Sequence, residues 1–466
     1  MEVVIANSSP ITKRSWLIIG AVCICLLFLP NGIYLLVCAL TLLTIVSLLW
    51  RIHRPGISSF SLMMQWTQVV TYVIWMDFTG NGMDRGWSRH GGAAVLFSCM
   101  GLMVITVVFS RGIRTLKIPS RKDLEEWARP FNQRKILALY IFSTLFLGSL
   151  GFALGAGFAQ ILITIRGAKW IFFLLYGYLC YIRKKNYSIL VLIILFEFTT
   201  GLVSYFSDFK EVLLYTFILT LTFIKKISGK QVLYGLFSGV ALIFIMITWT
   251  AIKGDYRNYL NQGQHQQVVA VSKSDAFSHM GEQIKGLSWE KYQMALNLMF
   301  LRLQYIMHLA ITMDRVPDVL PHEYGNVWWE NVSFVIMPRI LFPNKPIYEA
   351  TVKTRKYTGI NYAGFQQGAS FSLGYFADSY IDFGYLGMFV PLALIALYVV
   401  FIYRSFYKLT RVNLLLRYAL INVSLYQFCS FEADGLYMFG RLTSSFLVFW
   451  IIGRTLLPRL QNWMYK

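Results

Sequence analysis

The chain alternates long apolar stretches with short polar segments in which Lys and Arg predominate. Stretches such as 16–30 and 136–159 are almost continuously apolar, which is typical of helices that have a lipid bilayer as their solvent. The pattern predicts an all-α polytopic membrane protein with about 12 transmembrane helices. The predicted spans are 15–30, 32–50, 59–78, 91–110, 136–158, 168–182, 187–206, 212–224, 232–251, 385–403, 416–431 and 438–456.

One long polar segment, residues 252–371, interrupts this pattern late in the chain. Loops of that length without elements of their own are uncommon. We predict a helix over Ser288–Met313 and an amphipathic, interfacial helix over Trp328–Phe342. The predicted organisation is therefore nine transmembrane helices in 1–251, a large external loop in 252–371, and three more helices in 372–466.

Composition and charge narrow the class of protein. Of the 466 residues, 56% are hydrophobic and only 14% are charged, too few charges to cover the surface of a soluble domain. The net charge of +21 comes from Lys and Arg at the ends of apolar segments, without the basic face on a soluble domain that nucleic-acid binding requires. We therefore expect membrane lipid, and not nucleic acid, around this protein.

The basic residues also predict the orientation in the membrane. With the N-terminus inside, most Lys and Arg of the short loops fall on the cytoplasmic side, as the positive-inside rule requires. The prediction is a multi-pass protein of the cytoplasmic (inner) membrane with both termini cytoplasmic, a retained first helix, and residues 252–371 outside. The six cysteines lie in apolar stretches and no metal-binding spacing, P-loop or HExxH motif occurs, so we expect no metal and no cofactor.

Charged residues of both signs gather at the predicted outer ends of the spans and in the long loop. Arg and Lys suit phosphate oxygens, and a neighbouring carboxylate can accept a proton from a sugar hydroxyl. Asp378 and Asp382 are four residues apart and share a helical face, where they either carry chemistry, or act as caps or pair with arginines of the loop. His308 is either a satisfied interfacial histidine or part of the site. The candidate cations and their supporting residues are Lys210, Arg257, Arg302, Arg339, Lys345, Arg355 and Arg441, with Tyr305 and Tyr380.

Two short segments resemble the O-antigen polymerase (Wzy-type) family of oligosaccharide repeat-unit polymerases. The segment 338–346, PRILFPNKP, is similar to a proline- and arginine-containing segment in the large outer loop of that family. The segment 378–384, DSYIDFG, is similar to a family segment that begins with Glu and has Asn where Asp382 stands here. The plan of about 12 spans with one late external loop also agrees with the family.

The resemblance implies a GT-C-like fold and a membrane-embedded glycosyltransferase that needs no metal. The implied donor and acceptor are undecaprenyl-diphosphate-linked oligosaccharides, joined into O-antigen of lipopolysaccharide, capsule or exopolysaccharide, with a chain-length regulator and a flippase as partners. Asp378 would then act as the base, and Arg302 and Arg339 would act at the reacting diphosphate. The further diphosphate ligands would be Lys210, Arg257, Lys345 and Arg355, supported by Tyr305, His308, Tyr380, Asp382 and Arg441. The alternatives are an O-antigen ligase, and a lipid-oligosaccharide flippase or other transporter.

Overall fold

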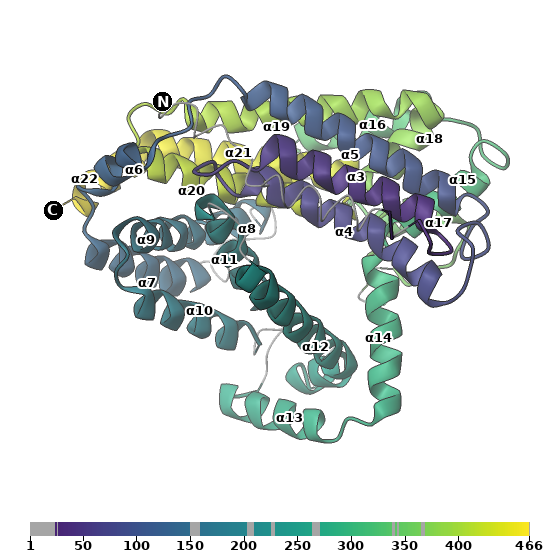
Figure 1. The fold of residues 1–466 in the computed structure, drawn as a ribbon, viewed down its shortest axis with the longest axis horizontal. Coiled ribbons are helices and arrows are strands. Elements are labelled where there is room, and N and C mark those ends of the chain that lie inside the picture. The colour runs from purple at the N-terminus through teal and green to yellow at the C-terminus, as the bar shows by residue number, and fades with distance from the viewer. Residues whose placement is uncertain are drawn as a thin grey trace. The chain divides into compact units, whose positions relative to one another are not determined.

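The regular structure of the chain is helical in the computed structural model (Figure 1), and the described residues contain no strand. The structure describes residues 24–25, 27–149, 159–202, 209–224, 229–262, 271–337, 341–342, 344–364 and 369–465. The prediction of an all-α protein is confirmed for this part of the chain. Its contacts divide it into two compact units.

The first unit contains the described parts of Met1–Asn186, Ile218–Phe223 and Tyr305–Lys466. Helix α5 packs against both α3 and α19, and α20 packs against α9 and α21. The helices of this unit are α3 (Gly32–Leu49), α4 (Ile57–Phe78), α5 (Gly91–Ile113), α6 (Arg121–Ala128), α7 (Gln133–Ser149), α8 (Ala159–Arg166), α9 (Lys169–Arg183), α15 (Ile306–Arg315), α16 (Asn326–Ile336), α17 (Ala350–Thr358), α18 (Tyr375–Gly387), α19 (Phe389–Tyr407), α20 (Leu414–Leu425), α21 (Gly435–Thr455) and α22 (Leu457–Met464).

The second unit contains the described parts of Tyr187–Phe217 and Ile224–Gln304. Its core is built from aromatic and aliphatic side chains: the ring centroid of Trp249 lies 5.8 Å from that of Phe209 and 5.6 Å from that of Tyr256. The helices are α10 (Tyr187–Leu202), α11 (Phe209–Phe223, which continues into the first unit), α12 (Gly229–Leu260), α13 (Lys273–Lys285) and α14 (Trp289–Leu303).

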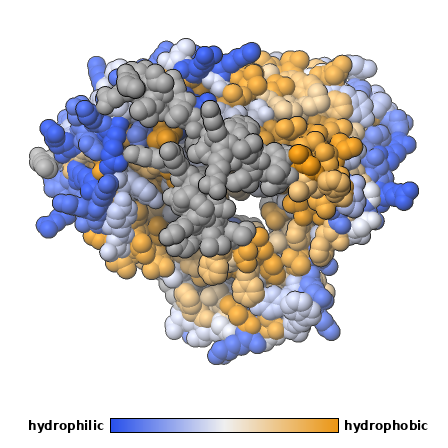
Figure 2. Space-filling view, viewed as in Figure 1, coloured by the Kyte–Doolittle hydropathy of each residue, from blue (hydrophilic) through white to orange (hydrophobic). Residues whose placement is uncertain are grey.

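Apolar side chains cover broad areas of the surface in view (Figure 2). On α19 they follow the helical period, since Val390, Leu394, Leu397 and Phe401 are each at least 52% exposed. In water such a stripe would be costly, whereas in a bilayer it faces acyl chains. These faces and the long apolar helices are those of a multi-pass membrane protein.

Six described helical segments are long and apolar enough to cross a membrane, and α14 with α15 would make a seventh if the pair is one span. The six are Gly32–Leu49, Gly91–Ile113, Ile161–Arg183, Gly239–Leu260, Phe389–Tyr407 and Gly435–Thr455. The count of about 12 and the GT-C-like fold therefore stay predictions. The first predicted span, 15–30, falls largely outside the described residues.

Residues 252–371 are helical for much of their length, as their length led us to expect. The single helix predicted over Ser288–Met313 is instead two helices, because α14 ends at Leu303 and α15 begins at Ile306. The amphipathic helix predicted over Trp328–Phe342 is present as the shorter α16. Helices α15, α16 and α17 belong to the first unit, where they surround the beginning of α18.

Candidate active site

The site begins where the chain enters α18 and α21, two helices far apart in the sequence. The Tyr375 N–H donates to the Ala433 carbonyl at 2.8 Å, and the Asp434 N–H donates to Ser372 Oγ at 2.9 Å. Gly374 makes the close approach possible: its φ is +86°, and a Cβ there would lie 2.9 Å from the Phe431 carbonyl oxygen. These contacts place the first turns of both helices side by side.

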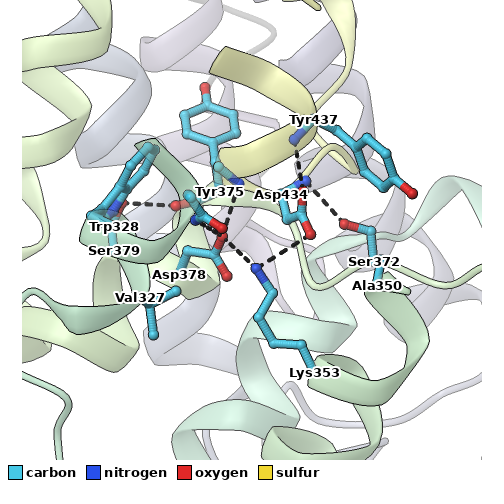
Figure 3. A network of polar contacts seen from close by, with 12 residues as sticks. Val327, Trp328, Ala350, Lys353, Ser372, Tyr375, Asp378, Ser379, Asp434 and Tyr437 are labelled. Atoms are coloured by element: carbon cyan, nitrogen blue, oxygen red, sulfur yellow. Dashed lines mark hydrogen bonds and ion pairs between the residues drawn. The ribbon is translucent and has the colours of Figure 1, made fainter. Parts of the chain in front are cut away.

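Asp378, in the first turn of α18, is fully buried at this junction (Figure 3). Its Oδ2 accepts three hydrogen bonds: from Lys353 Nζ at 2.9 Å, from Asn331 Nδ2 at 3.0 Å and from the Gly435 N–H at 2.8 Å. Its other oxygen, Oδ1, is buried and has no hydrogen-bond partner among the described residues. One carboxylate oxygen is thus fixed by three donors, while the second is left as an open acceptor.

A second buried carboxylate, Asp434, lies beside the first. Its Oδ1 accepts from the Tyr437 N–H at 2.9 Å and so caps the N-terminus of α21. Its Oδ2 lies 3.2 Å from Lys353 Nζ and accepts a hydrogen bond from the Tyr348 hydroxyl. Lys353, 14% exposed and carried by α17, therefore bridges two carboxylates that are both 0% exposed.

The charged groups in this cluster shift one another's pKa values. Burial raises the pKa of Asp378 above its ordinary value, and the neighbouring Asp434 raises it further, although Lys353 and the Gly435 N–H act in the opposite direction. Burial alone would lower the pKa of Lys353, but Asp378 and Asp434 together raise it. Lys353 therefore stays protonated, and Asp378 holds a proton more readily than an exposed aspartate does.

Helix α16 forms one wall of the site and is held there by Asp382. The two carboxylate oxygens of Asp382 accept the N–H groups of Val327 at 3.0 Å and Trp328 at 2.8 Å, which satisfies the start of α16. The indole of Trp328 in turn donates to Ser379 Oγ at 3.2 Å. Asp382 is therefore a structural neighbour of Asp378 that positions the helix carrying Asn331.

The other sequence-predicted residues of the first unit lie around this site with structural partners. Lys345 donates to the carbonyls of Phe334 and Met337 at the end of α16, and Arg355 Nε donates to the Tyr362 carbonyl at 2.8 Å. The Tyr380 hydroxyl donates to the Val316 carbonyl at 2.8 Å, and the Arg441 guanidinium lies 5.2 Å from the centroid of the Tyr437 ring. None of these four donates to either buried aspartate in the described contacts.

Tyr305 and His308 connect to the same region from α15. The Tyr305 ring stacks on that of His308 with 4.4 Å between centroids, and its hydroxyl bonds to the backbone of Ser372, whose Oγ accepts from the Asp434 N–H. His308 is buried, and its Nε2 has no partner among the described residues. Tyr305 therefore helps to position Ser372, which bonds to the backbone of Asp434, and His308 packs against Tyr305.

Three further predicted cations belong to the second unit, where they lie within electrostatic reach of one another. Partial desolvation, followed by the positive charges of Arg302 and Arg257, lowers the pKa of Lys210. Each of the three cations comes from a different helix. Lys210 is in α11, which begins at Phe209, Arg257 is in α12, and Arg302 is near the end of α14. The sequence-based prediction named these three, together with Arg339, Lys345 and Arg355, as ligands of one diphosphate, and that role stays a prediction. Arg339, the remaining candidate, lies outside the described residues.

The sequence-based prediction missed Lys353, Asp434, Asn331 and Tyr348 as members of the site. The sequence shows that Glu432, Asp434 and Lys353 are charged, but no motif ties any of them to Asp378. The available signal was the Asp434–Gly435 pair, four residues before the predicted span 438–456. An aspartate near the start of a helix is a common N-cap.

The described residues contain no group of three or more His, Cys, Asp or Glu side chains that could hold a metal ion. What the cluster can do is accept, hold and release a proton at Asp378, next to a fixed positive charge. The fold and the site therefore define a class of protein. It is an all-helical membrane protein with a buried Asp–Lys–Asp cluster where two helices begin.

Residues 102–459 match a family described as "Domain of unknown function (DUF8712)", and this match covers more than half of the chain. The protein belongs to this family. Comparison with curated proteins and with solved structures finds no match.

Proposed function

We propose that this protein is a membrane-embedded glycosyltransferase that joins lipid-diphosphate-linked oligosaccharide repeat units into a surface polysaccharide. The reaction would take place at the outer face of the cytoplasmic membrane, with both chain termini in the cytoplasm. Two separate lines support the proposal: the O-antigen polymerase resemblance of segments 338–346 and 378–384, and the chemistry available at Asp378.

The observation that carries the proposal is the environment of Asp378. The residue singled out by the resemblance as the base is fully buried, and three donors fix its Oδ2 while Oδ1 is open. An aspartate in water has a pKa of about 3.9 and is a weak base, so a raised pKa favours proton abstraction near neutral pH.

In the proposed step, Asp378 Oδ1 accepts the proton of an acceptor-sugar hydroxyl. The hydroxyl oxygen forms a bond to the anomeric carbon of the donor sugar, and the bond from that carbon to the phosphate oxygen breaks. The electron pair of the broken bond leaves with the polyprenyl diphosphate. The proton remains on Asp378 until it is released to water, so atoms and charges balance.

The leaving diphosphate requires positive charge, and the sequence supplies two candidate sources. One is the grouping of Lys210, Arg257 and Arg302 in the second unit. Burial, followed by the neighbouring positive charges, lowers the pKa of Lys210 there, and a bound anion would favour its charged form. The other is the segment around Arg339, Lys345 and Arg355. Electrostatic stabilisation of this kind commonly contributes about 3 kcal/mol per oriented donor.

Because Asp378 is 0% exposed, an acceptor hydroxyl can reach it only when a covering element moves. Lys353 is a partly exposed member of the cluster, and the proposal has α17, which carries it, shift during the reaction. The resting arrangement would then keep the base desolvated until substrate enters.

The test replaces Asp378 with Asn in the native host and follows the length of the surface polymer on gels. Asn keeps the size of the side chain but removes the base, so we expect polymer to fall at least 100-fold, within the range of general-base catalysis. The matched control is Asp318→Asn, an exposed aspartate that bonds to Arg89 on the same unit. The control should leave polymer length and membrane level unchanged.

The deletion strain separates the proposed function from its alternatives. Loss of a polymerase leaves single repeat units on the carrier or surface, loss of a ligase leaves finished polymer on the lipid carrier, and loss of a flippase leaves units inside the cell. Full-length polymer made by a well-expressed Asp378→Asn variant would rule out the assignment of this site as the catalytic one.

A further inference from the structure

The first unit has a polar hollow where α7 begins and α9 ends. It has a volume of about 330 Å³ and is lined by Phe131, Asn132, Gln133, Arg134, Arg183 and Asn186. Two of the six lining residues are arginines and none is a carboxylate. A concave site with positive charge and amide groups, but no acid, is suited to an anion.

The walls of this hollow are fixed by hydrogen bonds. Arg183 Nη2 donates to the carbonyls of Ala128 and Phe131, both at 2.6 Å, and the Asn186 amide donates to Gln133 Oε1 at 2.7 Å. The Asn132 N–H donates to the Met464 carbonyl at 2.8 Å, so the C-terminal helix braces the same rim. The hollow is therefore preformed, which lowers the entropic cost of binding.

An apolar stripe leads away from the hollow along α7. The stripe lies on the same helical face as the exposed Arg134. It runs through Ala138 and Ile141 to Leu145, with Phe142 and Phe146 beside it. Ile141 is 48% exposed, Phe142 59%, Leu145 68% and Phe146 50%. In a bilayer this stripe faces acyl chains, so an anion held in the hollow would lie at the headgroup end of the lipid that covers α7.

We propose that this hollow binds the phosphate of an anionic phospholipid, with Arg134 and Arg183 at the headgroup and the α7 stripe against the acyl chains. Basic pockets at the ends of transmembrane helices recognise such headgroups by charge. The lipid would join the start of α7 to the end of α9 and thereby stabilise the first unit.

The test measures lipid binding to the purified full-length protein by native mass spectrometry and by the midpoint of thermal unfolding. The probes are phosphatidylglycerol, phosphatidylcholine and inorganic phosphate. We expect phosphatidylglycerol to bind and raise the midpoint, and the other two to have little effect. Arg134→Gln should weaken phosphatidylglycerol binding roughly five-fold, since a basic residue near a lipid surface contributes about 1 kcal/mol.

Two variants keep the result interpretable. Lys122→Gln removes an exposed positive charge on α6 that does not line the hollow, and it should bind phosphatidylglycerol like the unmodified protein. Leu145→Gln should weaken lipid binding without touching the arginines. Equal stabilisation by inorganic phosphate would overturn the lipid assignment, and equal binding of phosphatidylcholine would overturn the role of charge. The thermal-unfolding midpoint of Arg134→Gln without lipid shows whether this variant is folded. If the folded variant binds phosphatidylglycerol as tightly as the unmodified protein, the proposed site is wrong.

Discussion

Removing the positive charge of Lys353 should destabilise the first unit strongly. Lys353 Nζ lies 2.9 Å from Asp378 Oδ2 and 3.2 Å from Asp434 Oδ2, and both aspartates are fully buried. Lys353→Met keeps most of the aliphatic volume but leaves two buried carboxylates facing each other. Breaking a buried pair from one side commonly costs about 3–5 kcal/mol, because the remaining charge has lost its partner.

The measured quantity is the midpoint of thermal unfolding in detergent, read from intrinsic fluorescence. For several hundred residues that unfold together, a loss of about 4 kcal/mol lowers the midpoint by roughly 5 °C. Adding Asp378→Asn and Asp434→Asn to Lys353→Met removes the unpaired charges and should restore most of the lost stability.

The matched control is Lys356→Met, three residues further along α17. Lys356 bonds to Glu323 at 2.9 Å but is 53% exposed, and exposed ion pairs contribute at most about 1 kcal/mol. A Lys353→Met midpoint no lower than that of Lys356→Met would refute the reasoning, and so would a triple variant no more stable than Lys353→Met alone.

Four further predictions concern the same unit. Gly435→Ala should destabilise by about 1–3 kcal/mol through overpacking, since its Cβ would lie 2.6 Å from Asn331 Nδ2; the thermal midpoint measures this. Gly56→Ala should lower the yield of folded protein on size-exclusion chromatography, because its Cβ would lie 2.0 Å from the Ile218 carbonyl oxygen. Asp382→Ala should cost about 2 kcal/mol, because it removes the cap of α16, and should lower polymer yield through stability; an unchanged midpoint would contradict this. The acid limb of activity should lie above the ordinary aspartate pKa, because the pKa of Asp378 is raised and the base must be unprotonated; the pH–rate profile tests this. The same raised pKa means that the folded state binds this proton more tightly than the unfolded state, so its contribution to stability is lost as pH rises through the folded value.

The helices could be predicted from the sequence because their signal is local. Apolar runs bounded by Lys, Arg and Gly predicted 32–50, 91–110 and 168–182, and the structure has helices at Gly32–Leu49, Gly91–Ile113 and Lys169–Arg183. The sequence-based prediction missed the break between α14 and α15. The segment 303–305 is Leu-Gln-Tyr and has no proline or glycine that would mark a helix end. Such a break follows from tertiary packing, which hydrophobic periodicity does not record.

The site was predicted only in part, for a similar reason. Asp378 was predicted from its segment and from its four-residue spacing to Asp382, both of which are features of the sequence. Lys353 and Asp434 meet Asp378 through contacts that join α17 and α21 to α18 across 25 and 56 residues of chain. Charge alone could not choose between Lys353, Lys345 and Arg355, and the structure shows that the last two bond to backbone carbonyls.

The burial of Asp378 has one physical consequence that joins stability to the proposed chemistry. An exposed aspartate is a weak base toward a sugar hydroxyl. Burial makes the carboxylate more basic, but burying its charge costs stability. Lys353 and the N–H of Gly435 offset that cost at Oδ2 and leave Oδ1 without a donor. Had the donors been shared between both oxygens, the carboxylate would be just as stable and a poorer base. Under the proposed function, this uneven distribution of partners would suit Asp378 to proton transfer.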